Sequence, residues 1–125
     1  MASKQVSLGR FPTEAAQNVA LGQGGSVYTT ASSDAIKPPT NRRFVAIQML
    51  EDTVFDASSG LVATDASEYV NTETAAHDLS DGSETTSYGS GGQVVDTVTF
   101  PQGMTIFGRW KEIDVSSGKV IAYLG

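Results

Sequence analysis

The sequence contains no cysteine, which excludes a disulfide-stapled scaffold and a thiolate metal site. It also lacks any apolar run of about 18 residues, so we expect no membrane-spanning segment and no membrane partner. Glycine, serine and threonine are abundant instead, and these residues favour turns and strands over helices. A chain of 125 residues with this composition is expected to form one all-β domain.

Lysine and arginine are missing from residues 44–98, where ten acidic residues lie. Nucleic-acid binding needs basic side chains on the phosphates, so we expect no nucleic-acid partner. Residues 1–43 have the opposite bias, with five basic and two acidic residues. This leading segment either binds an acidic surface or carries an ordinary surface charge bias. The basic residues expected to bind a partner are Lys4, Arg10, Arg42 and Arg43.

Residues 1–43 are expected to form an extended N-terminal arm, because their apolar residues are scattered and separated by breakers. Short strands are predicted at Gln17–Leu21 and Ser26–Thr30, and a single helical turn at Thr13–Ala20. Such an arm either packs along its own domain or reaches to a neighbouring molecule and orders on contact.

Residues 44–125 are expected to form a compact β-sandwich or β-barrel. Arg43–Leu50 is largely apolar on both faces, which predicts a central strand that is buried on both sides. Alternating apolar residues predict further strands at Gln93–Phe100 and Met104–Val115. Gly108 lies within the second of these, where a bulge, a bend or a close approach of another group is expected.

The last stretch of the sequence predicts a β-hairpin. Its turn ends in Gly118, which suits the left-handed position of a short hairpin loop. Lys119–Leu124 is therefore expected to pair back onto Met104–Val115. Because apolar residues continue to Leu124, we expect this final strand to form an ordered sheet edge that is available for contact.

Residues 65–92 are acidic and rich in Gly and Ser, which predicts a long loop. His77, the single histidine of the sequence, lies in this loop without a nucleophile motif, so we predict a surface histidine and no catalytic residue. The carboxylates do not have EF-hand spacing, and they either hold Ca²⁺ in an irregular site or stay solvated. We expect no enzymatic activity, no resident metal and no cofactor.

Three aromatic residues lie on or beside the predicted hairpin, namely Phe107, Trp110 and Tyr123. Aromatic side chains at such positions belong to a core or a subunit interface, or they form a platform for a ligand. Arg109 and Lys111 flank Trp110, which favours the rim of an interface. We therefore predict that the three aromatics contribute to the core and to partner binding.

Two stretches carry a resemblance to a known family: "FVAIQMLEDTVFDA" and "VTFPQGMTIFGRWKEIDVSSGKVIAYLG". They resemble small virion structural proteins of tailed bacteriophages, in particular phages of cyanobacteria and other aquatic bacteria. The likeness covers residues 44–56 and 98–125, about a third of the chain. It is a pattern of apolar and glycine positions and not a catalytic fingerprint.

The resemblance implies a non-enzymatic β-sandwich or β-barrel subunit of a virion that is assembled in the host cytoplasm. The first expectation is a head decoration (cement) protein that binds and stabilises the major capsid protein shell as a symmetric oligomer, with a homotrimer as the expected state. The alternatives are a neck, tail or fibre-attachment component and a receptor-binding module.

Overall fold

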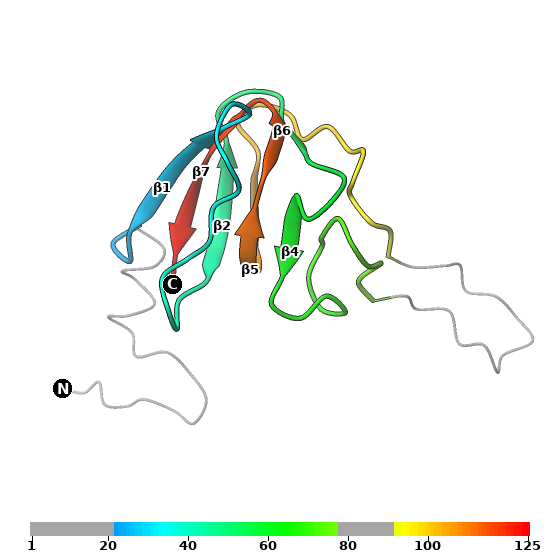
Figure 1. The fold of residues 1–125 in the computed structure, drawn as a ribbon, viewed down its shortest axis with the longest axis horizontal. Coiled ribbons are helices and arrows are strands. Elements are labelled where there is room, and N and C mark those ends of the chain that lie inside the picture. Colours follow the sequence, from blue (N-terminus) through cyan, green and yellow to red (C-terminus); the bar gives the residue numbers. More distant parts are fainter. Residues whose placement is uncertain (1–21, 78–91) are drawn as a thin grey trace, which may run out of the picture.

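The computed structural model describes residues 22–77 and 92–125 (Figure 1). Within these ranges the chain forms strands and loops, without a helix. The strands are β1 (Ser26–Thr30), β2 (Phe44–Met49), β3 (Val54–Phe55), β4 (Leu61–Ala63), β5 (Thr105–Ile113), β6 (Val115–Ser117) and β7 (Lys119–Leu124). The all-β class predicted from the composition is confirmed.

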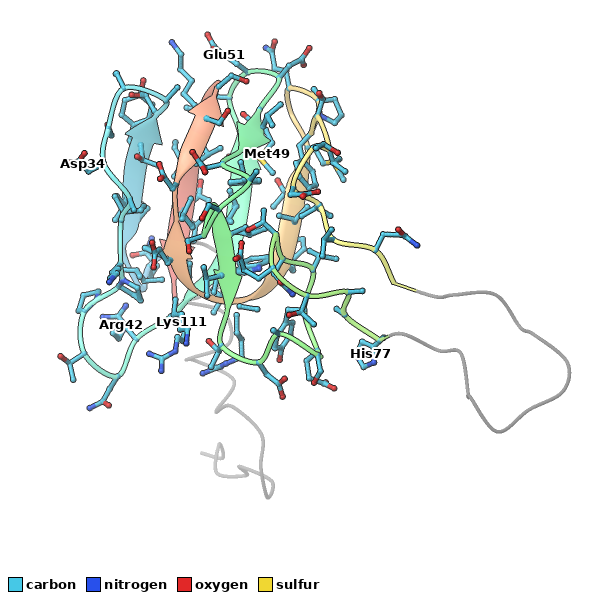
Figure 2. The ribbon with its side chains drawn as sticks, turned by 45° about the vertical axis from the view of Figure 1, so that its right-hand side comes forward. Asp34, Arg42, Met49, Glu51, His77 and Lys111 are labelled. Carbon is cyan, nitrogen blue, oxygen red and sulfur yellow. The ribbon has the colours of Figure 1, made fainter. Side chains whose placement is uncertain are left out.

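The strands form a five-stranded antiparallel sheet in the order β1-β7-β2-β5-β4 and a two-stranded sheet of β3 and β6. They do not close into a barrel, and the arrangement is sandwich-like. Figure 2 shows β4 and β6 in front of the strands that form the back of the larger sheet. The core lies between these layers, where the ring of Phe55 meets that of Phe100 edge-on at a centroid distance of 5.5 Å.

Strand β2 is the central strand of the larger sheet, as its apolar sequence predicts. The prediction that β2 is buried on both of its sides is wrong, however. Phe44, Ile47 and Met49 are fully buried, whereas Ala46 and Gln48 are only half-buried. A register irregularity between Phe44 and Ala46 brings Phe44 onto the buried side together with Ile47. The other side of β2 therefore belongs to a surface of the molecule.

Strand β5 contains the irregularity expected near Gly108. Three steps along β5, from Phe107 to Trp110, face only two steps along β2. The indole of Trp110 lies over Gly108 so closely that a Cβ atom on residue 108 would come within 2.7 Å of Trp110 Cζ2. Glycine is needed here because only a residue without a side chain leaves room for the indole ring.

The prediction that Lys119–Leu124 pairs with Met104–Val115 in a C-terminal hairpin is wrong. Gly118 does adopt the expected left-handed conformation, with φ of 94°. The strand that follows it, β7, pairs with β1 and β2 and not with β5, while β6 pairs with β3. The turn at Gly118 thus connects the two sheets. Strand β7 is an inner strand, so the expectation that it forms a sheet edge is also wrong; the edges are β1 and β4.

Two further segments differ from the sequence-based prediction. Residues 93–100 form no strand, and within them only Phe100 forms a β-bridge, to Thr53. The Val95 amide instead donates a hydrogen bond to the Asn71 carbonyl in a loop, and Val95 packs against the core. The predicted β1 strand is confirmed, and it belongs to the main sheet through its pairing with β7. Ile36 also bridges to Ile113. Residues 22–43 therefore pack along their own domain and not as a separate arm, and residues 1–21 lie outside the described ranges.

Candidate interaction surface

One side of the larger sheet faces outward, and it is built from the alternate residues of four neighbouring strands. The register places Tyr123 of β7 and Phe107 of β5 on either side of Ala46 of β2, in one cross-strand row. A second row runs from Tyr28 of β1 through Ile121 of β7 to Gln48 of β2. We call this surface the outer face; its members are Tyr28, Ala46, Gln48, Phe107, Ile121 and Tyr123.

The outer face exposes large apolar side chains. Phe107 has 76% of its surface exposed and Tyr28 57%, the two highest values among the exposed large hydrophobic residues described. Ile121 and Tyr123 are half-buried, and the Tyr123 hydroxyl donates a hydrogen bond of 3.3 Å to Gln48 Oε1. Apolar side chains that gather in rows on an exposed sheet face are typical of a surface that binds another molecule.

Basic residues border the outer face at one end of the sheet. The Arg43 Nε atom donates a hydrogen bond of 3.1 Å to Thr64 Oγ1, and the Thr64 amide donates one of 2.9 Å to the Arg109 carbonyl. Figure 2 shows Arg42 and Lys111 at this same end of the sheet. We call Arg42, Arg43, Arg109 and Lys111 the basic end.

The members of the basic end differ in the contacts that their side chains make. Arg42 donates a hydrogen bond through Nη2 to the Gly24 carbonyl, and Arg43 donates one of 2.6 Å through Nη1 to the Arg42 carbonyl. Arg109 and Lys111 are exposed on β5, two and four residues after Phe107, and form no ion pair within the described part of the chain. Their charged groups are free to meet an acidic partner.

Trp110 does not belong to this surface. Its side chain is fully buried in the core, and its Nε1 donates a hydrogen bond of 2.8 Å to the Val70 carbonyl. The predicted role in the core is confirmed, and the predicted role in partner binding is wrong, because the indole points to the side of β5 opposite Phe107. Of the seven predicted partner-binding residues, the structure places Arg42, Arg43, Phe107 and Tyr123 on or beside the outer face. Lys4 and Arg10 lie outside the described residues.

The acidic stretch after β4 covers the core and is organised around Asn71. The Asn71 side chain is fully buried, and its Nδ2 donates to the carbonyls of Ala66 and Tyr69 at 3.0 and 2.8 Å. Its Oδ1 accepts hydrogen bonds from the amides of Glu73 and Thr74 at 2.8 and 2.7 Å. The Asn71 side-chain amide therefore holds this loop in place. The sequence of the loop, by contrast, shows few side chains that would be expected to be buried.

The candidate catalytic and metal-binding residues of this stretch are not assembled into a site. His77 is exposed, and its Nε2 lies 3.5 Å from Glu68 Oε2. Ser67 donates two hydrogen bonds to Asp65 Oδ1, and these hold the pKa of Asp65 below its usual value. Within residues 22–77 and 92–125, no three His, Cys, Asp or Glu side chains are grouped so that they could hold a metal ion. The carboxylates of residues 78–91 lie outside the described ranges.

Asp114, at the junction of the two sheets, provides a prediction about pH. Burial raises its pKa, and the neighbouring carboxylates of Asp56, Glu112 and Asp34 raise it further. A folded state that binds this proton more tightly than the unfolded chain loses stability as the pH rises from 3.8 through the folded-state pKa. Asp114→Asn should therefore raise the melting temperature at pH 7 slightly, on the order of 1–2 °C.

Thermal unfolding of the wild type and Asp114→Asn at pH 7 and at pH 3 checks this expectation. The difference between them should vanish at pH 3, where the aspartate is protonated in both states. A variant that is less stable than the wild type at pH 7 would show that the Asp114 carboxylate is engaged in a favourable contact.

The sequence did not predict four members of the outer face, namely Tyr28, Ala46, Gln48 and Ile121. Their alternation within strands was visible, but which strands are neighbours was not. Comparison of the chain with models of known protein families, with curated proteins and with solved structures finds no match. No helix in the described part of the chain has the length and apolar character needed to cross a membrane.

Proposed function

We propose that the chain is a non-enzymatic structural subunit of a tailed-bacteriophage particle, and specifically a capsid decoration protein that binds the major capsid protein shell as a symmetric oligomer. The observation that carries this proposal is the outer face, where Phe107 and Tyr28 stand exposed beside a basic end. A face of this kind is suited to contact with another protein, because burying apolar area stabilises the association.

The mechanism of such a protein is mechanical and not chemical. A subunit that bridges its neighbours adds its own binding free energy to the shell, so the shell resists dissociation more strongly. The rigid sheet holds the rows of the outer face in fixed positions, and the bonding of β7 between β1 and β2 ties down the last strand of the chain. Little conformational entropy is then lost when the face binds.

The test is the quantity of the protein on purified particles and the effect of Phe107→Asp. Wild-type protein should be present in many copies per particle, as measured by quantitative mass spectrometry. Loss of a buried phenyl ring removes about 1.5–3 kcal/mol, so Phe107→Asp should weaken attachment by roughly 10-fold to 100-fold. Its folding should be unchanged, since the ring is exposed in the free chain.

Met104→Asp is the matched control. Met104 is also exposed, at 41%, but it lies before β5 and outside the two rows of the outer face. This variant should attach as the wild type does. Particles that lack the protein altogether, or attachment of Phe107→Asp at wild-type strength, would contradict the proposed function.

A further inference from the structure

The basic and the acidic side chains of the described residues gather on separate surfaces. The stretches that form the basic end and its surroundings, residues 42–46 and 105–113, contain four basic residues and one carboxylate, Glu112. The described stretches 65–77 and 92–98 contain no lysine or arginine. We call them the acidic side; their carboxylates are Asp65, Glu68, Glu73 and Asp96.

The geometry of Trp110 places the acidic side on the side of the sheet opposite the outer face. Its indole enters the core from β5, and Nε1 donates to the carbonyl of Val70 in the acidic side. Phe107 and Arg109 stand exposed on the same strand while Trp110 is fully buried. The acidic side thus covers the core face of the sheet, whereas the outer face looks the other way. The basic end lies beside the start of the acidic side, because Thr64, which precedes Asp65, forms hydrogen bonds with both Arg43 and Arg109.

The acidic side also exposes apolar groups. Val70 and Val98 have 40% and 39% of their surface exposed. Their segments are joined by a hydrogen bond of 3.0 Å from the Val95 amide to the Asn71 carbonyl. The acidic side therefore combines apolar side chains with negative charge, which complements the apolar side chains of the outer face and the positive charge of the basic end.

We infer that the outer face of one copy of this chain binds the acidic side of a second copy. This inference rests on the proposed function and identifies the partner of its surface. In a face-to-face pair of outer faces each basic end would meet either the other basic end or the uncharged members of the outer face, so no opposite charges would pair. Contact between two different surfaces is heterologous: it forms a ring where the rotation from copy to copy closes, and an open filament where it does not. The ring is the symmetric oligomer that the proposed function requires.

Self-association through these surfaces should depend on salt. Salt screens the attraction between exposed charges that are more than a Debye length apart. The Debye length shrinks from roughly 14 Å at 0.05 M to about 4 Å at 0.5 M ionic strength, so the attraction between the two surfaces weakens. Sedimentation velocity of the full-length protein should therefore show oligomers that dissociate at least about 10-fold more readily at the higher salt concentration. A protein that stays monomeric at all concentrations up to the limit of solubility would overturn the inference.

Charge reversal with complementation gives the sharpest test. One variant carries Arg109→Glu and Lys111→Glu, whose side chains are exposed and form no ion pair within the described residues. The other carries Glu68→Lys and Asp96→Lys, chosen because Asp65 and Glu73 accept backbone hydrogen bonds. The dissociation constant of self-association should rise by at least about 10-fold for each variant alone. An equimolar mixture of the two variants should associate again, because the reversed surfaces of one variant complement those of the other.

Asp34→Lys is the control, since Asp34 lies away from both Arg42 and Lys111 (Figure 2) and should leave association unchanged. Reversal variants that associate as the wild type does, or a mixture that fails to recover association, would overturn the inference. These measurements use the free protein only. Particles that bind a protein that is monomeric in solution in many copies would therefore leave the proposed binding to the capsid standing, while this inference falls.

Discussion

Trp110→Ala is expected to unfold a large part of the population at temperatures where the wild type is fully folded. The indole is fully buried and packs over Gly108, so its removal leaves a large cavity in the core. Such a truncation costs about 3–5 kcal/mol, a large share of the 5–15 kcal/mol typical of a domain. The loss of the hydrogen bond to the Val70 carbonyl adds to this cost.

Chemical denaturation monitored by circular dichroism measures the effect. Trp110→Phe keeps most of the ring but cannot donate to Val70, so it should cost less, about 1–3 kcal/mol. Phe107→Ala removes an aromatic ring from the outward side of the same strand and should change stability by less than about 0.5 kcal/mol. Wild-type stability of Trp110→Ala would show that the indole is not part of the core.

Asn71→Ala is expected to have the second largest effect. The change removes four hydrogen bonds from a fully buried side chain, two donated by Nδ2 and two accepted by Oδ1. At about 0.5–1.5 kcal/mol for each bond, the loss of all four should lower the free energy of unfolding by roughly 2–6 kcal/mol. The effect should concentrate in residues 65–77, because all four partners lie there.

Hydrogen exchange locates the effect. The amides of Glu73 and Thr74, which donate to Oδ1, should lose protection in Asn71→Ala more than the amides of β2 do. Asn71→Asp is an informative comparison, since the carboxylate still accepts from these amides but cannot donate to Ala66 and Tyr69. Equal protection of Glu73 and Thr74 in all three proteins would mean that the side chain does not organise this loop.

The strands could be predicted from the sequence where side chains alternate. The alternation within Ser26–Thr30, the apolar run of β2 and the positions of Phe107 and Trp110 on β5 all carry this signal. The pairing of β7 could not be predicted, because alternation fixes which side a residue faces but not which strand lies beside it. Gly118 signalled a turn equally well for a hairpin and for a crossing between two sheets.

The outer face could be predicted only in part for the same reason. Phe107 and Tyr123 lie far apart in the sequence, and they share a row only because β2 lies between their strands. Trp110 was predicted to lie at the rim of an interface because it stands between two basic residues. The alternation of β5 instead turns its side chain into the core, while Arg109 and Lys111 stay exposed. The buried role of Asn71 carried no sequence signal, because a polar residue in an acidic stretch looks like any solvated loop residue.

An electron cryomicroscopy map of the intact particle tests the central claim most directly. The account predicts many copies of the chain on the shell, with Phe107 and Tyr123 covered by a neighbouring subunit and the basic end of each copy against carboxylates. A map in which the outer face looks into solvent on every copy, or in which the particle has no density for this chain, would contradict it.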